Sequence, residues 1–271
     1  SRNKPLADEV DPKVLARRTP GFTPADIENM LNEAALLAAR DKRVKITMID
    51  IQEGINKVLM GPKKKSRLVT EDDKKITAIH EAGHAVAMYS LPTHDPVRHI
   101  TIIPRGQSLG STWSLPRDDS FNMTRNQMYE EIVSLLGGRV AEALFLGDIS
   151  TGASNDIQRA TSLARNMVTL YGMSEALGLM APATVGNQYL DGQSYLDCSQ
   201  ETSALVDREV QKLLNTCYNE TKTLLTDNRE LLDEISAHLL TKETITGDEL
   251  MAFVNASKAQ PAAEETTPTE E

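Results

Sequence analysis

The stretch AIHEAGHAVA, residues 78–87, places two histidines and a glutamate inside an otherwise apolar run. An apolar run of this kind is typical of a buried helix, and a buried charged group must find a partner because leaving it unpaired destabilises the fold. His80 and His84 are four residues apart, so on a helix their rings lie on one face, about 6 Å apart along the axis. Any fold of this chain therefore has to bring matching groups to these side chains.

The spacing of these residues is that of a metal site. Two imidazoles on neighbouring helical turns can share a Zn²⁺ ion, which binds histidine nitrogen at about 2.0–2.1 Å. Glu81 lies about 100° round the helix from His80, where its carboxylate can take a proton from a metal-bound water. This is the H-E-x-x-H arrangement. The competing interpretation is a core helix whose two histidines and glutamate fell in register by chance, and we favour the metal site because the pattern is rare by chance.

A catalytic zinc ion needs a third protein ligand and one open position. The other histidines, His94, His99 and His238, have no suitable acidic or histidine neighbours in the sequence. Two acids remain as candidates, Asp156 in the first turn of a helical pattern and Glu142 in the middle of another. Spacing alone does not choose between them, since Asp156 also suits a helix N-terminus and Glu142 a solvated helix surface.

Most of the chain has a helical pattern. Apolar residues recur at three- and four-residue spacing, which predicts amphipathic helices, and the clearest strand is the β-branched run VRHITIIP at 97–104. The pair Gly137–Gly138 is expected to interrupt one helix. Helices are expected at residues 11–19, 23–42, 47–61, 70–91, 124–146, 154–171, 200–226, 228–240 and 246–257. The sequence therefore predicts a mainly α protein with a small β element.

Composition excludes several classes of protein. The chain has 271 residues and a net charge of −10, which argues against a nucleic-acid partner. No apolar run is long enough to span a bilayer, so we expect these residues to be soluble by themselves. Cys198 and Cys217 are the only cysteines, too few for a disulfide framework, and are interpreted as reduced thiols. The chain begins without Met, and we expect it to be part of a longer protein.

Several stretches together resemble one known family. HEAGHAV, ITIIPRGQSLG, LLGGRVAEALFLG and STGASNDIQRATSLARNMVTLYGMSEALG resemble, in the same order, the peptidase domain of FtsH-type, membrane-tethered AAA+ zinc proteases. The match runs from about Lys74 to Leu179. The earlier stretch RNKPLADEVDPKVLARRTPGFTPADIENMLNEAALLAAR resembles the C-terminal helical, or lid, subdomain of the AAA+ module that precedes the peptidase in this family.

The resemblance implies a role for each residue of the site. His80 and His84 match the two histidine ligands of one zinc ion, and Asp156 of TGASND matches the third ligand. Glu81 matches the catalytic glutamate, and Glu142 matches a GGRxAE glutamate close to the site. An acid in that position can orient a ligand imidazole through its other N–H, so we expect Glu142 to support the metal site.

The resemblance also implies a domain order. Residues 1–61 are expected to be the lid subdomain, truncated at its N-terminal side, and 62–69 a linker. Residues 70–258 are expected to form a mostly helical zinc peptidase domain with a small β element. Residues 259–271 are expected to be a disordered acidic tail, because they lack apolar anchors.

Nucleotide binding is expected only in part. The family has a Gly before the Ala-Asp of its lid subdomain, near the adenine of ATP, and here Pro24 precedes Ala25. Pro has no backbone N–H group with which to donate a hydrogen bond to adenine. Pro24 and Ala25 are therefore named as candidates for adenine contact and no more. No G-x-x-x-x-G-K-[ST] phosphate loop occurs in the chain, so ATP and Mg²⁺ are expected to act only in a full-length protein.

The expected function is that of a zinc metalloendopeptidase in an ATP-dependent protease that unfolds and degrades misfolded or regulatory proteins. The resemblance implies unfolded protein substrates, a homo-hexamer, and attachment to the cytoplasmic side of a bacterial inner membrane through segments upstream of this chain. The strand at 97–104 is expected to be an edge strand that pairs with substrate. The alternatives are a catalytically silent helical oligomerisation module and a stand-alone zinc hydrolase that uses Glu142 as its ligand.

Overall fold

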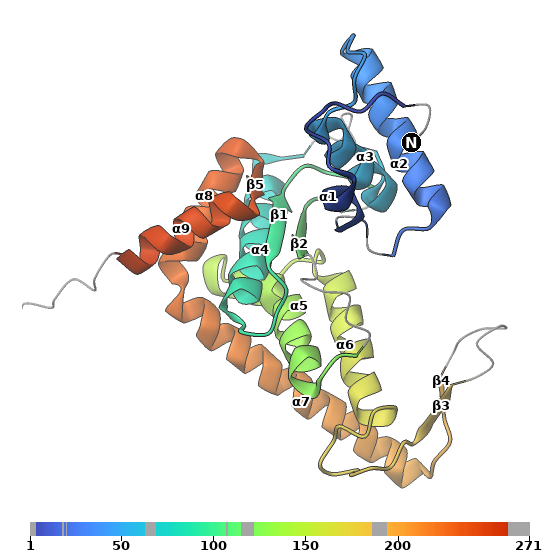
Figure 1. Cartoon of the computed structure of the whole chain (residues 1–271). Helices are drawn as coiled ribbons and strands as arrows, with labels where there is room; N and C mark the ends of the chain where they lie inside the picture. Colours follow the sequence, from blue (N-terminus) through green and yellow to red (C-terminus); the bar gives the residue numbers. More distant parts are fainter. Residues whose placement is uncertain are drawn as a thin grey trace, which may run out of the picture. The chain divides into compact units, whose positions relative to one another are not determined.

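The computed structural model describes residues 4–17, 19, 21–62, 69–106, 108–114, 122–185 and 194–259 (Figure 1). The elements in chain order are α1 (Pro12–Arg17), α2 (Pro24–Arg40), α3 (Met48–Met60), α4 (Glu71–Ser90), β1 (Val97–Thr101), β2 (Ser111–Ser114), α5 (Arg125–Phe145), α6 (Ser154–Thr169), β3 (Ala183–Val185), β4 (Ser194–Leu196), α7 (Gln200–Asp227), α8 (Arg229–Lys242), β5 (Thr244–Thr246) and α9 (Gly247–Ala259). The fold is mainly α with a small β element, as the sequence predicts. Within the described ranges, no helix is both long enough and apolar enough to cross a lipid bilayer.

The chain divides into two compact units. The N-terminal unit comprises residues 1–69 with 103–110, and the main unit comprises 70–102 with 111–271. The segment 103–110, which the sequence assigned to the peptidase domain, thus groups with the N-terminal unit. Most of the expected linker and residues 260–271 of the expected tail lie outside the described residues, while Ala259 is the last residue of α9.

The N-terminal unit is a small helical bundle held by caps and a compact core. Thr23 and Asp26 form a capping box at the start of α2, and Thr47 and Asp50 form one at the start of α3. These boxes satisfy backbone N–H groups that have no partner within the helix. The buried core that joins the helices includes Met30, Leu31, Ala34, Ala38, Ile46, Ile51 and Ile55.

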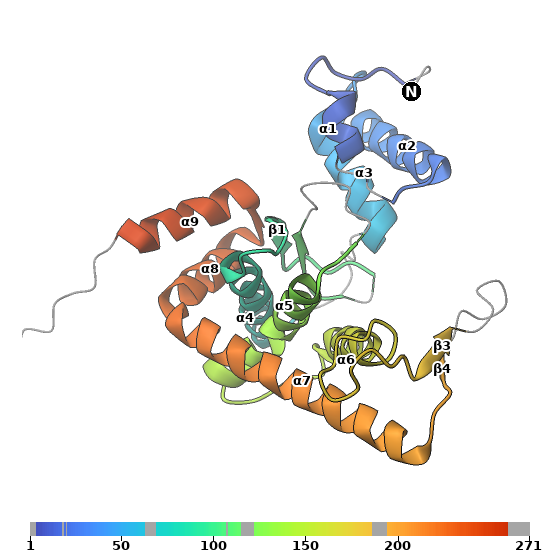
Figure 2. The ribbon, with the colours of Figure 1, turned by 60° about the horizontal axis from the view of Figure 1, so that its bottom comes forward.

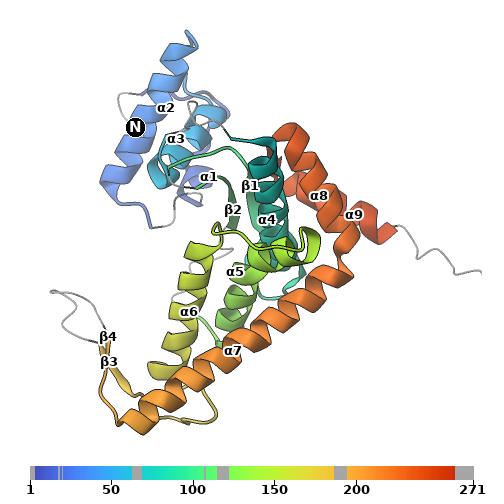
Figure 3. The ribbon, with the colours of Figure 1, turned by 180° about the vertical axis from the view of Figure 1, so that it is seen from behind.

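The main unit is built around α4. This helix packs against α5, α8 and β1, while α5 packs against α6 and the long helix α7 (Figures 2 and 3). The residues from Thr77 to Ala87 are all buried, which explains why this part of α4 is apolar on every side apart from its histidines and Glu81. The core helix anticipated from the sequence therefore lies at the centre of the larger unit.

Small residues allow α4 and α5 to cross closely. A Cβ atom added to Gly83 would lie 2.5 Å from the carbonyl oxygen of Gly137 and 2.5 Å from the Cβ of Ala141. The expected interruption at Gly137–Gly138 is wrong, because α5 continues without a break from Arg125 to Phe145. These glycines lower helix propensity, but the contact that they permit with α4 outweighs this cost.

The sheet corrects a second expectation. β1 is the central strand of an antiparallel sheet with the order β2-β1-β5, so it is not an edge strand. The side chain of Ile100 on β1 is fully buried, as suits a central position. The strand β5 was not predicted because its three residues lie between two helical patterns and are too few to set a period. The hairpin of β3 and β4 was also not predicted.

Candidate metal centre

One helix delivers two histidines and a glutamate to the interior of the main unit. His80, Glu81 and His84 are all buried on α4. The two rings meet edge to face with their centroids 4.7 Å apart, and their Nε2 atoms are 3.0 Å apart. The four-residue spacing on one helix thus directs both nitrogens to a common point.

A second helix brings a carboxylate to the same point. Asp156 lies in the first turn of α6, and its Oδ2 atom is 3.4 Å from Nε2 of His80 and 3.6 Å from Nε2 of His84. The ligand atoms of the three residues all lie within 4.8 Å of one another. We refer to His80, His84 and Asp156 as the His-His-Asp cluster.

The geometry of the His-His-Asp cluster fits a zinc ion. Four ligands placed tetrahedrally at 2.0–2.1 Å from Zn²⁺ are separated from one another by about 3.3 Å. The three separations observed here are 3.0, 3.4 and 3.6 Å. Two imidazoles and one carboxylate are also the donor set of catalytic zinc sites that keep a position open for water or substrate.

The outer nitrogens of both rings are held by α5. Nδ1 of His80 is 2.7 Å from Oε1 of Glu142, and Nδ1 of His84 is 2.8 Å from the carbonyl oxygen of Ser134. An acceptor at Nδ1 favours the tautomer that carries its proton there, which leaves the Nε2 lone pair directed at the cluster. Glu142 is held in turn by Ser150, whose N–H and hydroxyl group donate to its two carboxylate oxygens at 2.6 and 3.0 Å.

Gly138 makes room for the ring of His80. A Cβ atom at this position would lie 2.4 Å from Cε1 and 2.5 Å from Nε2 of that ring. No side chain can occupy this space without moving the imidazole. The glycine pair in α5 therefore serves the site as well as the crossing of the two helices.

The site is electrostatically prepared for a cation. Burial alone lowers the pKa of His80, but hydrogen bonds to Asp156 and Glu142 outweigh it and raise the pKa to about 10. Burial tends to raise the pKa of Asp156, and contacts with both histidines reverse this and hold it well below its usual range. Burial raises the pKa of Glu81. Carboxylates gathered around two imidazoles favour positive charge, whether a proton or a metal ion.

Glu81 is held by a residue that the sequence did not indicate. The hydroxyl group of Thr112 on β2 lies 2.7 Å from Oε2 of Glu81 and 3.1 Å from its main-chain oxygen. Thr112 and Ser150 were missed because single hydroxyl residues in strands and loops are common and carry no spacing signal, and Ser134 was missed because its contact uses the main-chain oxygen that every residue has. Only the packing of the chain brings them to the site.

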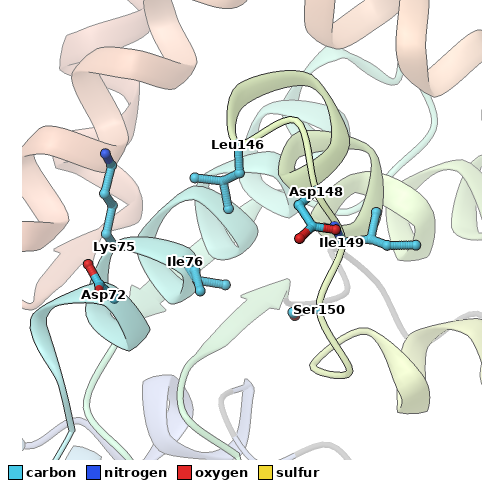
Figure 4. Close-up of a pocket in the computed structure, with 7 residues that line it drawn as sticks. All are labelled: Asp72, Lys75, Ile76, Leu146, Asp148, Ile149 and Ser150. Carbon is cyan, nitrogen blue, oxygen red and sulfur yellow. The ribbon is translucent and has the colours of Figure 1, made fainter.

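A pocket of about 280 Å³ lies beside the site, between the start of α4 and the loop that follows α5 (Figure 4). Its apolar wall comes from Ile76, one turn before His80, together with Leu146 and Ile149. Ser150, which holds Glu142, also lines it. The remaining lining residues are Asp72, Lys75 and Asp148.

The other candidates from the sequence lie apart from the cluster. Pro24 and Ala25 are exposed in the first turn of α2, in the N-terminal unit. His94 lies 3.2 Å from the hydroxyl group of Ser134 and 3.3 Å from Oε2 of Glu131, behind the helix segment that supports His84. His99 lies on β1, and His238 packs against Phe253 on α9.

Comparison with known proteins identifies related chains. Residues 67–253 match the model of Peptidase family M41, and residues 9–53 match that of the AAA+ lid domain. A relative from Thermoanaerobacter sp. (strain X514), named ATP-dependent zinc metalloprotease FtsH 1, is 50% identical over 94% of this chain and 42% of its own length. Relatives named ATP-dependent zinc metalloprotease FtsH from Thermotoga maritima and Rubrobacter xylanophilus are each 47% identical over 94% of this chain and 42% and 40% of their lengths.

The chain spans about two fifths of the length of these curated relatives. The M41 match covers well over half of the chain and includes the whole His-His-Asp cluster and Glu81. The AAA+ lid match precedes it, in the order that the sequence motifs indicate. This chain belongs to peptidase family M41, with an AAA+ lid segment ahead of the peptidase segment.

Proposed function

We propose that this chain is the zinc-dependent, peptide-hydrolysing part of an ATP-dependent protease. The observation that carries the proposal is the convergence of His80, His84 and Asp156 at separations that suit one zinc ion. Membership of Peptidase family M41 and the name that the relatives share, ATP-dependent zinc metalloprotease, support it.

Each residue of the site has a role in the proposed reaction. His80, His84 and Asp156 would hold one zinc ion, and Glu142 and the Ser134 carbonyl would keep the two rings in place. A zinc ion bound there would supply Lewis acidity, polarising a peptide carbonyl and making bound water more acidic. Glu81 takes the proton of the attacking water and delivers it to the leaving amine, so that water and a peptide bond give a carboxylic acid and an amine.

The surroundings of the site suit an extended peptide. β2 ends the sheet next to Glu81, so a substrate backbone can add to it as a further strand, the role that the sequence analysis assigned to the strand at 97–104. The pocket of about 280 Å³ is smaller than the ~300–1,000 Å³ typical of small-molecule sites and suits one apolar side chain of that peptide. Backbone pairing combined with one small pocket supports cleavage of many unfolded sequences.

The proposal extends to a longer protein. The AAA+ lid match at residues 9–53 and the greater length of the relatives support an ATPase core that lies outside this chain and uses ATP with Mg²⁺. In that longer protein, Pro24 and Ala25 would lie near the adenine of the bound ATP. The family resemblance supports a homo-hexamer at the cytoplasmic side of a bacterial inner membrane that acts on unfolded proteins.

The test is to separate metal binding from peptide cleavage. The zinc-loaded chain is incubated with an unstructured, fluorescence-quenched peptide and with casein, alongside the variant Glu81→Gln. We expect one zinc ion per chain in both proteins, and a loss of cleavage of at least about 100-fold in the variant because its amide cannot accept the proton. Zinc binding without cleavage in the wild-type chain and in the assembled full-length protein would favour the silent oligomerisation module.

A further inference from the structure

As the proposed general base, Glu81 must hold its carboxylate at one point. Its carboxylate is buried on α4, and a buried glutamate without a fixed partner can adopt several rotamers. The Thr112 hydroxyl group, 2.7 Å from Oε2, supplies a hydrogen bond that removes this freedom. The main-chain oxygen of Glu81 lies 3.1 Å from the same hydroxyl group, but its single proton is directed to the nearer carboxylate oxygen.

The place of Thr112 in the fold makes this contact rigid. Thr112 pairs with Ile100 of β1, and the side chain of Ile100 is fully buried. A strand residue whose partner is fixed in the core cannot slide, because a shift of one residue would turn its side chain to the opposite face of the sheet. The hydroxyl group of Thr112 is therefore held against α4 by the register of the sheet.

We propose that Thr112 is a positioning residue for the general base, an inference that rests on the proposed function. Its hydrogen bond to Oε2 of Glu81 fixes the carboxylate and makes that oxygen less basic, which favours transfer of the water proton to Oε1. Since Thr112 belongs to the strand that ends the sheet, the base and the strand beside the peptide are held as one unit. A peptide that pairs with β2 is thereby placed at a fixed distance from Oε1.

A purely structural role for Thr112 makes a different prediction. In that case its β-branched shape on the strand matters and its hydroxyl group does not. Thr112→Val keeps the shape and removes the hydroxyl group, whereas Thr112→Ser keeps the hydroxyl group and removes the branch. Thr101→Val is the matched control, because Thr101 is a buried threonine of β1 whose hydroxyl group donates to the main-chain oxygen of Glu243.

The experiment measures kcat, KM and zinc content for these three zinc-loaded variants with an unstructured, fluorescence-quenched peptide. We expect Thr112→Val to lower kcat by about 10–100-fold with little change in KM or zinc content, as for other residues that orient a catalytic group. Thr112→Ser is expected to stay within about threefold of the wild-type kcat, and Thr101→Val is expected to keep the wild-type kcat. A purely structural role for Thr112 predicts the opposite order, with Thr112→Val closer to wild type than Thr112→Ser.

Crystal structures of the zinc-loaded Thr112→Val and Thr112→Ser variants give a readout that does not depend on activity. The proposal predicts that the Glu81 carboxylate moves in the Val variant and stays in place in the Ser variant. Wild-type kcat in Thr112→Val, or an unmoved carboxylate, overturns it. A wild-type chain that binds zinc but cleaves no peptide would overturn the proposed function instead, while the carboxylate positions would still decide whether Thr112 fixes Glu81.

Discussion

At the scale of single residues, the two nitrogens of each imidazole have different neighbours. The inner nitrogens of His80 and His84 face Asp156, while the outer nitrogen of His80 faces Glu142. A carboxylate on the inner side can share a metal ion with both rings, whereas one on the outer side can only orient a ring. This arrangement favours Asp156 over Glu142 as the ligand, a choice that residue spacing left open.

This difference predicts two sizes of effect on zinc binding. Asp156→Ala should abolish stoichiometric binding because it removes a ligand, while Glu142→Gln should weaken binding by about 10–100-fold because it removes an orienting group. Competition titration with a chromophoric zinc chelator measures both. Asp148→Ala is the control, since Asp148 is exposed in the loop between α5 and α6. If the Glu142 variant lost its zinc and the Asp156 variant kept it, the stand-alone hydrolase with a Glu142 ligand would be the better description.

At the scale of elements, the crossing of α4 and α5 sets the surroundings of the two histidines of the His-His-Asp cluster. Gly83 and Gly137 bring the two helix backbones together, and Gly138 lies against the ring of His80. Helices with larger residues at the contact pack 8–10 Å apart. The glycines therefore decide how near α5 comes to the histidines, and with it the positions of Glu142 and the Ser134 carbonyl.

Gly138→Ala should therefore damage the metal site more than the fold. Its methyl group would lie within 2.6 Å of three ring atoms of His80, and the ring must turn away. We expect zinc affinity to fall by at least about tenfold. Gly147→Ala is the control, because Gly147 has a positive φ of 69° and open space around it, so its substitution costs about 1–2 kcal/mol without touching the site. Equal zinc affinities in the two variants would contradict this account.

The pocket between α4 and the loop after α5 should influence which peptides are cut. Ile149 is 59% exposed at its rim, so Ile149→Ser removes apolar surface without disturbing the core. We expect the preference in kcat/KM for Leu or Phe over Ala beside the scissile bond to fall by about tenfold. Leu240→Ser, at a similarly exposed position on α8, should leave the preference unchanged. Identical selectivity in the Ile149 variant and the wild type would show that the pocket does not receive the substrate.

At the scale of the whole molecule, each unit has its own core and its own source of stability. The core of the main unit includes residues of α4 and α5 around the His-His-Asp cluster, whereas that of the N-terminal unit joins α2 and α3. A partly exposed charge pair adds to the smaller core: the buried Asp50 accepts hydrogen bonds from Arg43, whose side chain is 35% exposed, at 2.6 and 2.8 Å. Such paired hydrogen bonds are stronger than single neutral ones.

The stability of the N-terminal unit should depend on acid pH through this pair. Hydrogen bonds from Arg43 hold the pKa of Asp50 well below its usual value of about 3.9. A lowered native pKa stabilises the fold at neutral pH, and this contribution is lost progressively as the pH falls from about 4 towards the lowered pKa of Asp50. Hydrogen exchange of the α2 and α3 amides in the whole chain, corrected for intrinsic rates, should show this loss of protection.

Asp50→Asn tests the source of the effect. We expect the variant to lose about 2 kcal/mol of protection at pH 7 and to show a weaker dependence on acid pH. Asp8→Asn is the control, because the ion pair of Asp8 with Lys45 is exposed and contributes little. An Asp50→Asn variant with the wild-type dependence on pH would locate the titrating group elsewhere.

The sequence predicted where helices and strands lie better than it predicted which segments pack or pair with them. The capped amphipathic helices α2 and α3 lie close to the predicted ranges, because caps and apolar periodicity are local signals. The break at Gly137–Gly138 and the edge position of the strand at 97–104 were wrong. The continuity of α5 and the position of β1 in its sheet both depend on the segments packed against them, and local propensity carries no information about those segments.

The sequence by itself determined the ligand types and their spacing on α4, because His80, Glu81 and His84 are within one another's reach on any helix. It also limited the third ligand to two acids. Only the tertiary structure decided that Asp156 meets the inner nitrogens, that Glu142 and Ser134 hold the outer ones, and that Thr112 reaches Glu81. These contacts join residues from separate helices and a strand, and their distances are set by how closely the elements pack.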